Sequence, residues 1–442
     1  MAVMDRAKFL NQEIARIDGT PPSTHLAKHL KMAQSPFVFY RGSAQLFYAD
    51  LANHHLALPE ACFSMSLTSV MGDCHTSNFG FLTEEGSHGD TVIFTPNDFD
   101  DACVGYAHWD ILRYLTSLSL VEAHCKGISE GQFLIDVPDP LKPAVDTHQV
   151  NHAQSLFIQE YVATCQRVTE NSTVINEAME QEPDGKLKKF YNKASERSSC
   201  GEKFESKSAL AKAVHLTQDG LKFKHITDKY TPLSPAEHQQ VLTAFAPYMD
   251  DDIVDITSRE NAGTGSVNMR RFYFLVGPKK PHNAESFRYC HIVEVKQQRK
   301  AAPLFYFDNV CPVNQLNPAH LTARSQRRMQ RRPDLLLDEV IWDNAHWLIR
   351  SRHHAKVGLD PHDIGMGNKA RNGDFGYFAK LCGYTLALAH CRGDRRSTRF
   401  AKNAVKALNH HTNSALITSA NHYAKQVIDD HSWFCDTLKN TE

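Results

Sequence analysis

The sequence predicts an α+β fold, in which a small antiparallel β-sheet accompanies a larger helical part. Two observations lead to this fold class. Short runs rich in β-branched and aromatic residues, bounded by turn-forming residues, occur around 63–101 and again within 249–356. Most of the remaining chain instead has apolar residues at helical spacing. With 442 residues the chain exceeds the usual size of one core, so we expect two or three structural units.

The N-terminal quarter of the chain is predicted to contain helices followed by a hairpin. In the segment 35–52, SPFVFYRGSAQLFYADLA, apolar side chains lie roughly on one face of a helix, which is typical of packing against a core. The pattern then changes to short strands. FGFL (79–82) and TVIF (91–94) flank the turn-rich TEEGSHGD, which indicates a hairpin with a long tip.

Helices are expected again further along the chain. Helical periodicity returns at 109–122, and the stretch 126–251 is expected to be mostly helical, with Pro-rich and Lys/Glu-rich interruptions. The segment GYFAKLCGYTLALAH (376–390) and much of the chain from Arg399 onward also show helical spacing. Most of the predicted helical part therefore lies outside the two strand-rich regions.

A small antiparallel sheet is predicted in the second strand-rich region. RRFYFLV (270–276) and HIVEVKQQ (291–298) have the composition of strands and are joined by a Pro/Lys/Asn-rich connection. DEVIWDNAHWLIRSR (338–352) is predicted to form a hairpin that turns at Asp343 and Asn344. Three or more neighbouring strands of this kind are enough for one sheet.

The composition argues against several classes of protein. Lys and Arg number 49 against 50 Asp and Glu, so no net basic field exists to attract nucleic acid or an anionic membrane. The eleven cysteines are scattered without a CxxC pair, which argues against a disulfide framework and a zinc ribbon. Neither a signal-peptide pattern nor a run of about 18 apolar residues occurs. We therefore expect a cytoplasmic protein with reduced thiols and no nucleic-acid or membrane partner.

A short polar segment offers a candidate catalytic loop. Asp73 and Asn78 stand in the pattern D-x-x-x-x-N within GDCHTSNFG. In phosphoryl transfer this spacing supplies a carboxylate for the attacking hydroxyl and a metal ligand from one turn. The same residues also favour Asx-turn hydrogen bonds in an ordinary loop, and the spacing alone does not decide between these interpretations.

A second acidic segment strengthens the catalytic interpretation. Asn97, Asp98, Phe99 and Asp100 follow an apparent strand, one hairpin downstream of Asp73. Carboxylate and amide oxygens from the two segments could converge on one Mg²⁺ ion, a cation that prefers oxygen ligands. We predict Asp98 as the principal metal ligand, with Asp100 and Asn78 as further ligands.

A glycine turn and a lysine are candidates for binding phosphate. Gly263, Thr264, Gly265 and Ser266 precede a predicted strand, where glycines would let backbone N–H groups approach phosphate oxygens. A glycine turn that merely opens a hairpin is the simpler alternative. Lys296 lies on the probable next strand, where side-chain alternation would direct it to the same phosphates.

These motifs carry a resemblance to known families. Met71 to Asn78 resembles the catalytic loop of the protein-kinase-like superfamily, especially of aminoglycoside and choline phosphotransferases, and Asp98-Phe99-Asp100 resembles its metal motif. The wider set SPFVFYRG, GDCHTSNFG, NDFDDA, HWDILR, GTGSV, VEVKQ and LCGYTLALAH looks more closely like the uncharacterised bacterial family called domain of unknown function 2252 (DUF2252). This resemblance covers most of the chain except roughly 125–245.

The resemblance implies a two-lobed, protein-kinase-like fold that is circularly permuted. In an ordinary kinase the glycine loop and the lysine come first, and the catalytic loop follows about a hundred residues later. Here that order is inverted. The implied units are a C-lobe part with the catalytic loop and metal motif at 1–125, its mostly helical continuation at 126–248, an N-lobe-like sheet with the glycine loop and lysine at 249–356, and helices completing the C-lobe at 357–442.

The resemblance also implies roles for individual residues. Asp73 would accept or orient the proton of the attacking hydroxyl, and Lys296 with the 263–266 turn would hold the phosphates. Asp110, in HWD, would hydrogen-bond the backbone of the catalytic loop, although a helix N-cap is an equal alternative. His390, in LALAH, is interpreted as a core-facing histidine of a helix.

Three departures from the kinase pattern bear on activity. Met71 stands in place of the usual histidine before the catalytic loop, and Asn268 in place of the third glycine of the glycine loop. No glutamate partner for Lys296 is recognisable, because the expected helix LTARSQRRMQRR (321–332) contains no acidic residue. Lys296 would then contact phosphate alone or pair with a carboxylate elsewhere in the chain.

The leading hypothesis is a phosphotransferase that uses ATP, or another nucleoside triphosphate, with Mg²⁺ and acts on a hydroxyl of a small molecule or a protein. Two alternatives keep the same fold: a nucleotidyl (AMP) transferase, and a nucleotide-binding pseudokinase with a regulatory role. The missing glutamate and Asn268 favour the pseudokinase. The joint presence of Asp73, Asn78, Asp98 and Lys296 argues against it.

A transition-metal site is a further alternative, because the chain has 25 histidines. Three adjacent pairs are the most conspicuous: His54-His55, His353-His354 and His410-His411. Adjacent side chains point apart on a helix or strand, and no HExxH motif occurs, so this alternative is the weakest. The acceptor, the oligomeric state and the roles of Arg41 and of 125–245 are not indicated by the sequence.

Overall fold

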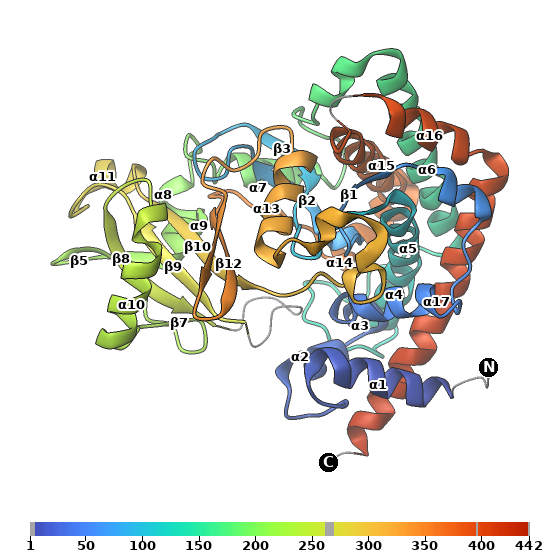
Figure 1. Ribbon diagram of the computed structural model, residues 1–442, viewed down its shortest axis with the longest axis horizontal. Coiled ribbons are helices and arrows are strands. Elements are labelled where there is room, and N and C mark those ends of the chain that lie inside the picture. The colour runs from blue at the N-terminus through green and yellow to red at the C-terminus, as the bar shows by residue number, and fades with distance from the viewer. Residues whose placement is uncertain (1–4, 261–268, 395–396, 441–442) are drawn as a thin grey trace.

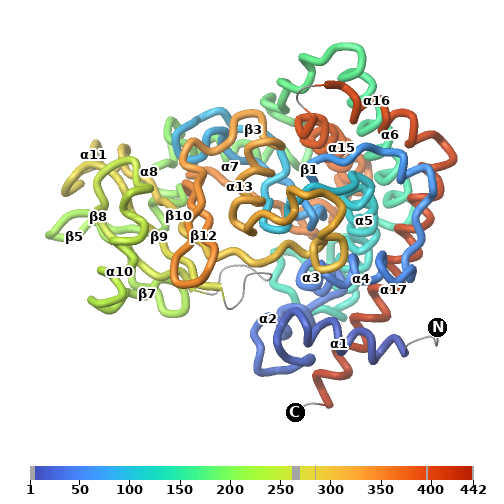
Figure 2. Tube along the Cα trace, viewed as in Figure 1, coloured from blue at the N-terminus to red at the C-terminus, as the bar shows by residue number. Residues whose placement is uncertain are grey.

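The computed structural model describes residues 5–260, 269–394 and 397–440. Helices are combined with several small antiparallel sheets, which confirms the predicted α+β class. The strands of the largest sheet gather at one side of the molecule and most of the long helices at the other (Figure 1). Both marked ends of the chain lie on the helical side, as the tube in Figure 2 also shows.

The largest sheet has six strands among the described residues. In spatial order they are β11 (Asp338–Trp342), β12 (Ala345–Ser351), β10 (His291–Gln298), β9 (Arg271–Val276), β8 (Ile253–Arg259) and β7 (Tyr230–Thr231). Neighbouring strands all pair antiparallel, which confirms the strands predicted in the second strand-rich region. Asp343 and Asn344 connect β11 to β12 with φ of 52° and 54°, the left-handed conformations that a tight two-residue hairpin turn requires.

Side-chain alternation gives this sheet two different faces. One face is apolar: Phe272, Val293 and Trp347 pack there against Phe245 of α10 (Pro235–Phe245). The rings of Phe272 and Trp347 stack with their centroids 5.5 Å apart. Burial of these aromatic side chains fixes which residues of each strand point to the other face.

The opposite face of the sheet carries a row of charged side chains. Glu294 and Lys296 alternate with the apolar residues of β10. The strand register places Arg350 of β12 opposite Glu294, and Arg271 of β9 opposite Lys296. α13 (Pro318–Met329) covers part of this charged face by packing against β10, β11 and β12.

Two smaller sheets hold the predicted catalytic loop and metal motif. Their strands are β1 (Leu67–Val70) paired with β4 (Cys103–Tyr106), and β2 (Phe79–Thr83) paired with β3 (Val92–Pro96) and β13 (Val357–Gly358). The hairpin predicted from FGFL and TVIF is thereby confirmed. Loops 71–78 and 97–102 connect the same two strand pairs, because Val70 pairs with Cys103 and Phe79 pairs with Pro96. The two loops therefore lie side by side.

The helical part is built around one buried helix. Its long helices are α5 (Ala107–Ser129), α6 (Thr147–Glu170), α15 (Phe375–Arg392) and α17 (His410–Lys439). Side chains on all faces of α5 are buried, which is the pattern of a central helix. α15 packs along α6, and α17 packs along α5. The helices predicted from periodicity in these regions are confirmed.

Shorter helices complete the helical part and the connections to the sheet. They are α2 (Ala27–Met32), α3 (Pro36–Gly42), α4 (Ala44–Ala52), α7 (Lys188–Ser195), α8 (Phe204–Lys207), α9 (Ala209–Ala213), α11 (Ala284–Arg288), α12 (Leu304–Phe307), α14 (Pro361–Gly365) and α16 (Arg399–Ala407). None of the described helices combines the length and the apolar character that a bilayer-crossing helix needs.

The two ends of the chain are joined through Arg6 at the start of α1 (Arg6–Asp18). Its Nε donates to Asp430 Oδ1 on α17 at 3.0 Å, and its Nη2 donates to Asp50 Oδ2 on α4 at 3.0 Å. Both carboxylates are buried, and the guanidinium compensates their charge. The C-terminal helix therefore lies beside the N-terminal segment.

The expectation of a mostly helical stretch at 126–251 is wrong for residues 214–231. There the chain forms β5 (Val214–Thr217), β6 (Gly220–Phe223) and the edge strand β7 of the large sheet. Leu221 and Phe223 pack against Tyr273 and Leu275 of the sheet. Such short segments have too few residues to show a period, so burial against the sheet determined their conformation.

Candidate active site

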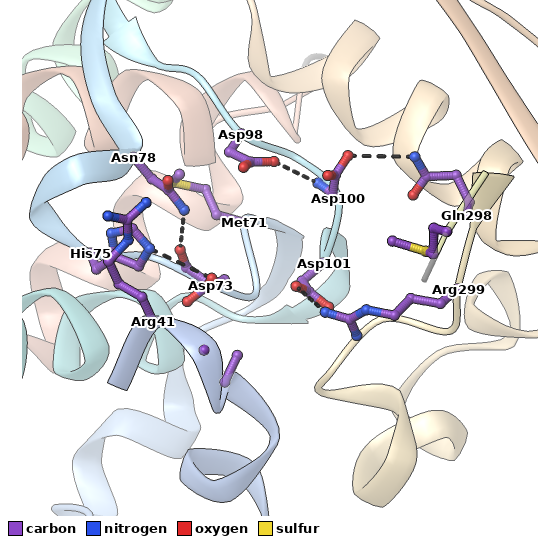
Figure 3. A pocket seen from close by; sticks show the side chains of 13 residues that line it. Arg41, Met71, Asp73, His75, Asn78, Asp98, Asp100, Asp101, Gln298 and Arg299 are labelled. Atoms are coloured by element: carbon purple, nitrogen blue, oxygen red, sulfur yellow. Dashed lines mark hydrogen bonds and ion pairs between the residues drawn. The ribbon is translucent and has the colours of Figure 1, made fainter. Parts of the chain in front are cut away.

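Two neighbouring cavities lie where the paired loops approach the charged face of the sheet. The small cavity has a volume of about 110 Å³, and Asp73 and Asn78 form part of its wall (Figure 3). The large cavity has a volume of about 370 Å³ and is lined by Lys296. Asp98 and Asp100 line both cavities. Predicted site residues from three segments of the chain therefore line two adjoining cavities.

The loop that carries Asp73 is held close to the neighbouring loop by Gly72. The φ of Gly72 is +75°, and a β-carbon at this position would lie 1.9 Å from the carbonyl oxygen of Asp101. Only glycine allows both this conformation and this approach. The glycine that precedes Asp73 thus determines how near the two acidic loops come.

Asp73 is oriented by a buried arginine. Arg113 of α5 is fully buried, and its Nε and Nη2 donate to Asp73 Oδ1 at 2.8 and 2.5 Å. His75 Nε2 lies 3.6 Å from Asp73 Oδ2. Burial on its own would raise the pKa of the Asp73 carboxyl, but Arg113 and His75 outweigh it and hold the pKa below its usual range. Asp73 is therefore ionised and has a fixed orientation at neutral pH.

Asn78 ties the end of the predicted catalytic loop, 71–78, to its beginning. Its Nδ2 donates to the carbonyl oxygen of Asp73 at 2.8 Å, and the side chain is almost fully buried. Because a carbonyl oxygen only accepts, this bond sets the orientation of the amide and leaves Oδ1 as the group available to a cation. The backbone oxygen of Asn78 also accepts from Asn97 N at 3.0 Å, which joins the two loops.

Asp110 holds the backbone at the start of the predicted catalytic loop. Its Oδ2 accepts from Met71 N at 2.6 Å, and its Oδ1 accepts from Gly72 N at 3.0 Å. His390 Nε2 lies 3.0 Å from Asp110 Oδ2, and Tyr161 Oη lies 2.8 Å from His390 Nδ1. His390 is fully buried, in agreement with its interpretation as a core-facing histidine. Asp110 thus hydrogen-bonds the backbone of this loop, and its role in supporting catalysis stays a prediction.

Replacing Asp110 with alanine is expected to destabilise the protein by about 2–4 kcal/mol, because two buried N–H groups and His390 would lose their acceptor. Urea unfolding followed by circular dichroism measures this loss. Asp139→Ala changes an exposed aspartate and serves as the matched control, with little expected effect. Equal stability of the two variants would contradict the assigned role of Asp110.

Lys296 has its carboxylate partner in the predicted metal motif. Its side chain is 1% exposed, and its Nζ donates to Asp100 Oδ2. Gln298 Nε2 also approaches Asp100 Oδ1, at 3.5 Å. Burial would raise the pKa of Asp100, but the charges of Lys296 and Arg350 outweigh it and hold the pKa below its usual range. The partner that the sequence of the 321–332 helix does not supply is therefore Asp100.

Asp98 is in a different electrostatic position from Asp100. Burial and the neighbouring Asp100 carboxylate raise the pKa of Asp98. Its Oδ1 accepts from the backbone N of Asp100 at 3.2 Å (Figure 3). The surrounding protein thus compensates the negative charge of Asp98 only in part. A bound cation would compensate the rest of this charge.

A buried glutamate anchors two arginines beside Lys296. Arg271 Nη1 donates to Glu294 Oε1 at 2.9 Å, and Arg350 Nε donates to Glu294 Oε2 at 2.8 Å. Burial would raise the pKa of Glu294, but these two arginines outweigh it and lower the pKa. The guanidinium groups are thereby held at the wall of the large cavity.

Positive charge dominates the large cavity. Its lining includes five lysines and arginines but three carboxylates, those of Asp98, Asp100 and Glu294. The five basic residues are Arg271, Lys296, Arg350, Arg352 and Lys356. Lys356 also donates to the carbonyl oxygen of Asn97 at 2.7 Å, which links this wall to the acidic loop. The cavity therefore has the charge that a polyanion requires.

The predicted glycine turn, Gly263 to Ser266, and Asn268 lie outside the described residues, and their role stays a prediction. The described residues on either side belong to neighbouring strands, because Arg259 ends β8 and Arg271 begins β9. Met269 lines the small cavity. The described end of this connection at Met269 therefore lies at the site.

Sequence reasoning missed several residues that shape the site. Arg113 follows Asp110 by one helical turn, so the HWDILR segment could have indicated that both face the catalytic loop. Glu294 and Arg350 could have been found from strand alternation, because Glu294 shares a face with Lys296. Arg41 lines the small cavity near His75 (Figure 3), but no local sequence pattern predicted that it lies at the site.

The comparisons with known proteins identify a family. A family model described as "Uncharacterized protein conserved in bacteria (DUF2252)" matches residues 21–437. No curated protein and no solved structure matches the chain. The match covers nearly the whole chain, including the 125–245 region that the motifs alone left out. The chain therefore belongs to the bacterial family DUF2252.

Proposed function

We propose that this protein is an ATP- and Mg²⁺-dependent phosphotransferase that acts on a hydroxyl of a small molecule or a protein. One observation carries the proposal. Asp98 and Asp100 form the shared wall between a cavity that contains Asp73 and a positively charged cavity that contains Lys296. A catalytic carboxylate, oxygen ligands and a phosphate-binding lysine are the groups that phosphoryl transfer needs from a protein.

The proposal includes a two-lobed, circularly permuted kinase-like fold. It is supported by the end of α15, which lies directly beside the strand that leads into the catalytic loop: Thr68 Oγ1 donates to the carbonyl oxygen of His390 at 2.6 Å. In an unpermuted order a helix of this kind would continue into β1. Arg6 supports the same view, because it brings the C-terminal helix beside the N-terminal segment.

The residues at the shared wall fit Mg²⁺. This ion prefers oxygen ligands and is usually held by one or two carboxylates together with phosphates and water. Asp98 and Asp100 would supply carboxylates, and Asn78 would supply the amide oxygen that its bond to Asp73 leaves available. When bound, the ion would neutralise charge on the phosphates. The incompletely compensated charge of Asp98 supports this assignment.

The protein groups then have distinct tasks. Asp73 is ionised and its Oδ1 is held by Arg113, so its Oδ2, which lies 3.6 Å from His75, can accept a hydrogen bond from an acceptor hydroxyl and orient it for attack. Lys296, Arg271 and Arg350 would bind the phosphates in the large cavity. Acceptor and nucleotide would thus approach the Asp98–Asp100 wall from opposite sides.

Two alternatives on the same site are distinguished by experiment. A nucleotidyl transferase would use the same residues with the triphosphate reversed, and the mass gained by the product separates phosphate from nucleotide. A pseudokinase is favoured by one observation: Lys296 pairs with Asp100, a proposed metal ligand, while Gln326 and Gln330 of the α13 region line the large cavity in place of an acidic residue. A protein that binds nucleotide without turnover would support this alternative.

Nucleotide binding is expected to raise thermal stability. A non-hydrolysable ATP analogue with Mg²⁺, at about 100 times its dissociation constant, should stabilise the native chain by about 2.7 kcal/mol. Differential scanning fluorimetry measures the shift in melting temperature. A parallel sample with a chelator in place of Mg²⁺ shows which part of the shift depends on Mg²⁺. Asp98→Ala should lose the Mg²⁺-dependent part of the shift, whereas the exposed Asp136→Ala should retain it. No shift of the native chain with any nucleoside triphosphate would refute the proposal.

A further inference from the structure

Two histidines and an aspartate from distant segments converge away from the candidate active site. His88 lies in the connection between β2 and β3, Asp250 lies just before β8, and His291 is the first residue of β10. His88 Nε2 is 2.8 Å from Asp250 Oδ2, and His291 Nε2 is 2.9 Å from Asp250 Oδ1. One nitrogen or oxygen atom of each side chain lies within 4.8 Å of the others.

This set of atoms has the chemistry of a transition-metal site. Two imidazole nitrogens and one carboxylate oxygen are ligands that zinc and similar divalent ions take in proteins. In a tetrahedral zinc site the ligand atoms lie about 3.3 Å apart, since each is about 2.05 Å from the metal. His88 Nε2 and His291 Nε2 contact different oxygens of Asp250, at 2.8 and 2.9 Å, and each of these two separations is within about half an ångström of that spacing.

We propose that His88, Asp250 and His291 bind one divalent transition-metal ion of the Zn²⁺ type, with water as the fourth ligand. His291 is mostly buried, while the side chains of His88 and Asp250 are 30% and 31% exposed. The ion would therefore be reached from solvent, and its open position would face solvent. This proposal is independent of the proposed phosphotransferase activity.

The position of the cluster indicates a structural task for the ion. His291 and Lys296 are five residues apart on β10, which is about 16 Å along a strand. His88 lies at the tip of the hairpin formed by β2 and β3, and Asp98 follows the base of that hairpin. An ion at the cluster would tether the hairpin tip to the end of the large sheet, while the other ends of both elements form the active site.

The histidines involved differ from those that the sequence made conspicuous. His55 pairs with Asp50, His354 packs its ring against Phe204, and His410 begins α17. Within the described part of the chain, none of the adjacent histidine pairs forms a group of three potential metal ligands. His88 and His291 are isolated in the sequence and meet only through the fold.

Zinc binding by the full chain tests the proposal directly. After chelator treatment and dialysis, Zn²⁺ is titrated in competition with a chromophoric chelator, and bound metal is counted by elemental analysis. We expect one equivalent in the native chain, and a loss of at least about tenfold in affinity for His88→Ala and Asp250→Asn, because each removes or weakens a ligand. His411→Ala, an exposed histidine on α17, should bind as the native chain does.

Two further arms make the result decisive. Zn²⁺ should raise the melting temperature of the native chain and of His411→Ala but not of His88→Ala, and circular dichroism verifies that each variant is folded. Asp98→Ala should retain its equivalent of zinc, because that residue belongs to the other site. Failure of the native chain to bind one equivalent, or unchanged binding by both His88→Ala and Asp250→Asn, overturns the proposal.

Discussion

Replacing Asp73 with asparagine is expected to slow phosphoryl transfer by about 10²- to 10⁴-fold, the usual contribution of a positioned general base. The carboxylate is ionised because Arg113 and His75 lower its pKa, and only its charged form can accept a hydroxyl proton. Asparagine has a similar shape but cannot take the proton. ATP consumption and the mass of any self-modified protein provide the measurement while the acceptor is unidentified.

The Asp73→Asn variant needs a control for folding, because it removes the charge that compensates buried Arg113. Melting temperature with and without nucleotide separates the two effects. The proposed mechanism requires that the nucleotide-dependent shift remain while turnover falls. The exposed Asp139→Asn is the matched variant, and it should change neither quantity. Turnover by Asp73→Asn at the native rate would remove Asp73 from the mechanism.

Replacing Arg113 with methionine is expected to lower the free energy of unfolding by about 3–5 kcal/mol, because it leaves a mostly buried carboxylate without its partner. Arg113 also donates to the carbonyl oxygen of Tyr40 at 3.0 Å and lies over the Tyr40 ring at 4.1 Å. Methionine retains much of the apolar volume but none of these polar contacts. Urea unfolding at pH 7 measures the loss.

The pH dependence of this loss has a definite direction. Arg113 lowers the pKa of Asp73 in the folded state, so the pair contributes stability above the unfolded pKa of aspartate, about 3.9. That contribution disappears as the pH falls through the lower folded value. In Arg113→Met the carboxyl protonates at higher pH, so the difference between variant and native protein should be largest near neutrality and shrink in acid.

A double variant and an exposed ion pair serve as controls for Arg113→Met. Arg113→Met combined with Asp73→Asn should recover part of the lost stability, because no unpaired carboxylate remains. Arg167→Met removes an exposed partner of Glu177 and should cost less than about 1 kcal/mol. A cost for Arg113→Met no larger than that for Arg167→Met would contradict the buried ion pair.

Local patterns predicted most of the secondary structure around the site. The β2–β3 hairpin followed from two short apolar runs around a turn-rich tip, and the β11–β12 turn followed from Asp343 and Asn344. These signals are reliable because they depend on neighbours in the chain. The strands at 214–231 were missed, because their conformation depends on burial against a sheet whose main strands begin further along the chain.

The sequence predicted those candidate site residues whose residue types and separation along the chain both matched a known kind of site. Asp73 with Asn78, and Asp98 with Asp100, stand in short segments whose spacing carries information. Spacing places Arg113 on one helix face with Asp110, and alternation could have placed Arg350 on the charged face of the sheet, but arginines are common on helices and strands, and packing shows which carboxylate each of them meets. The cluster of His88 and His291 was missed because its members are about two hundred residues apart along the chain.

The sequence by itself determined the α+β class, indicated the two acidic loops at Asp73 and Asp98, and contained enough motifs to indicate the family. Tertiary structure alone decided which distant groups share a cavity. The partner of Lys296 is the clearest case, because the helix expected to supply a glutamate has none, and Asp100, on the other side of the site, pairs with the lysine instead. A buried ammonium group must be paired, but which carboxylate pairs with it depends on how the strands and loops pack.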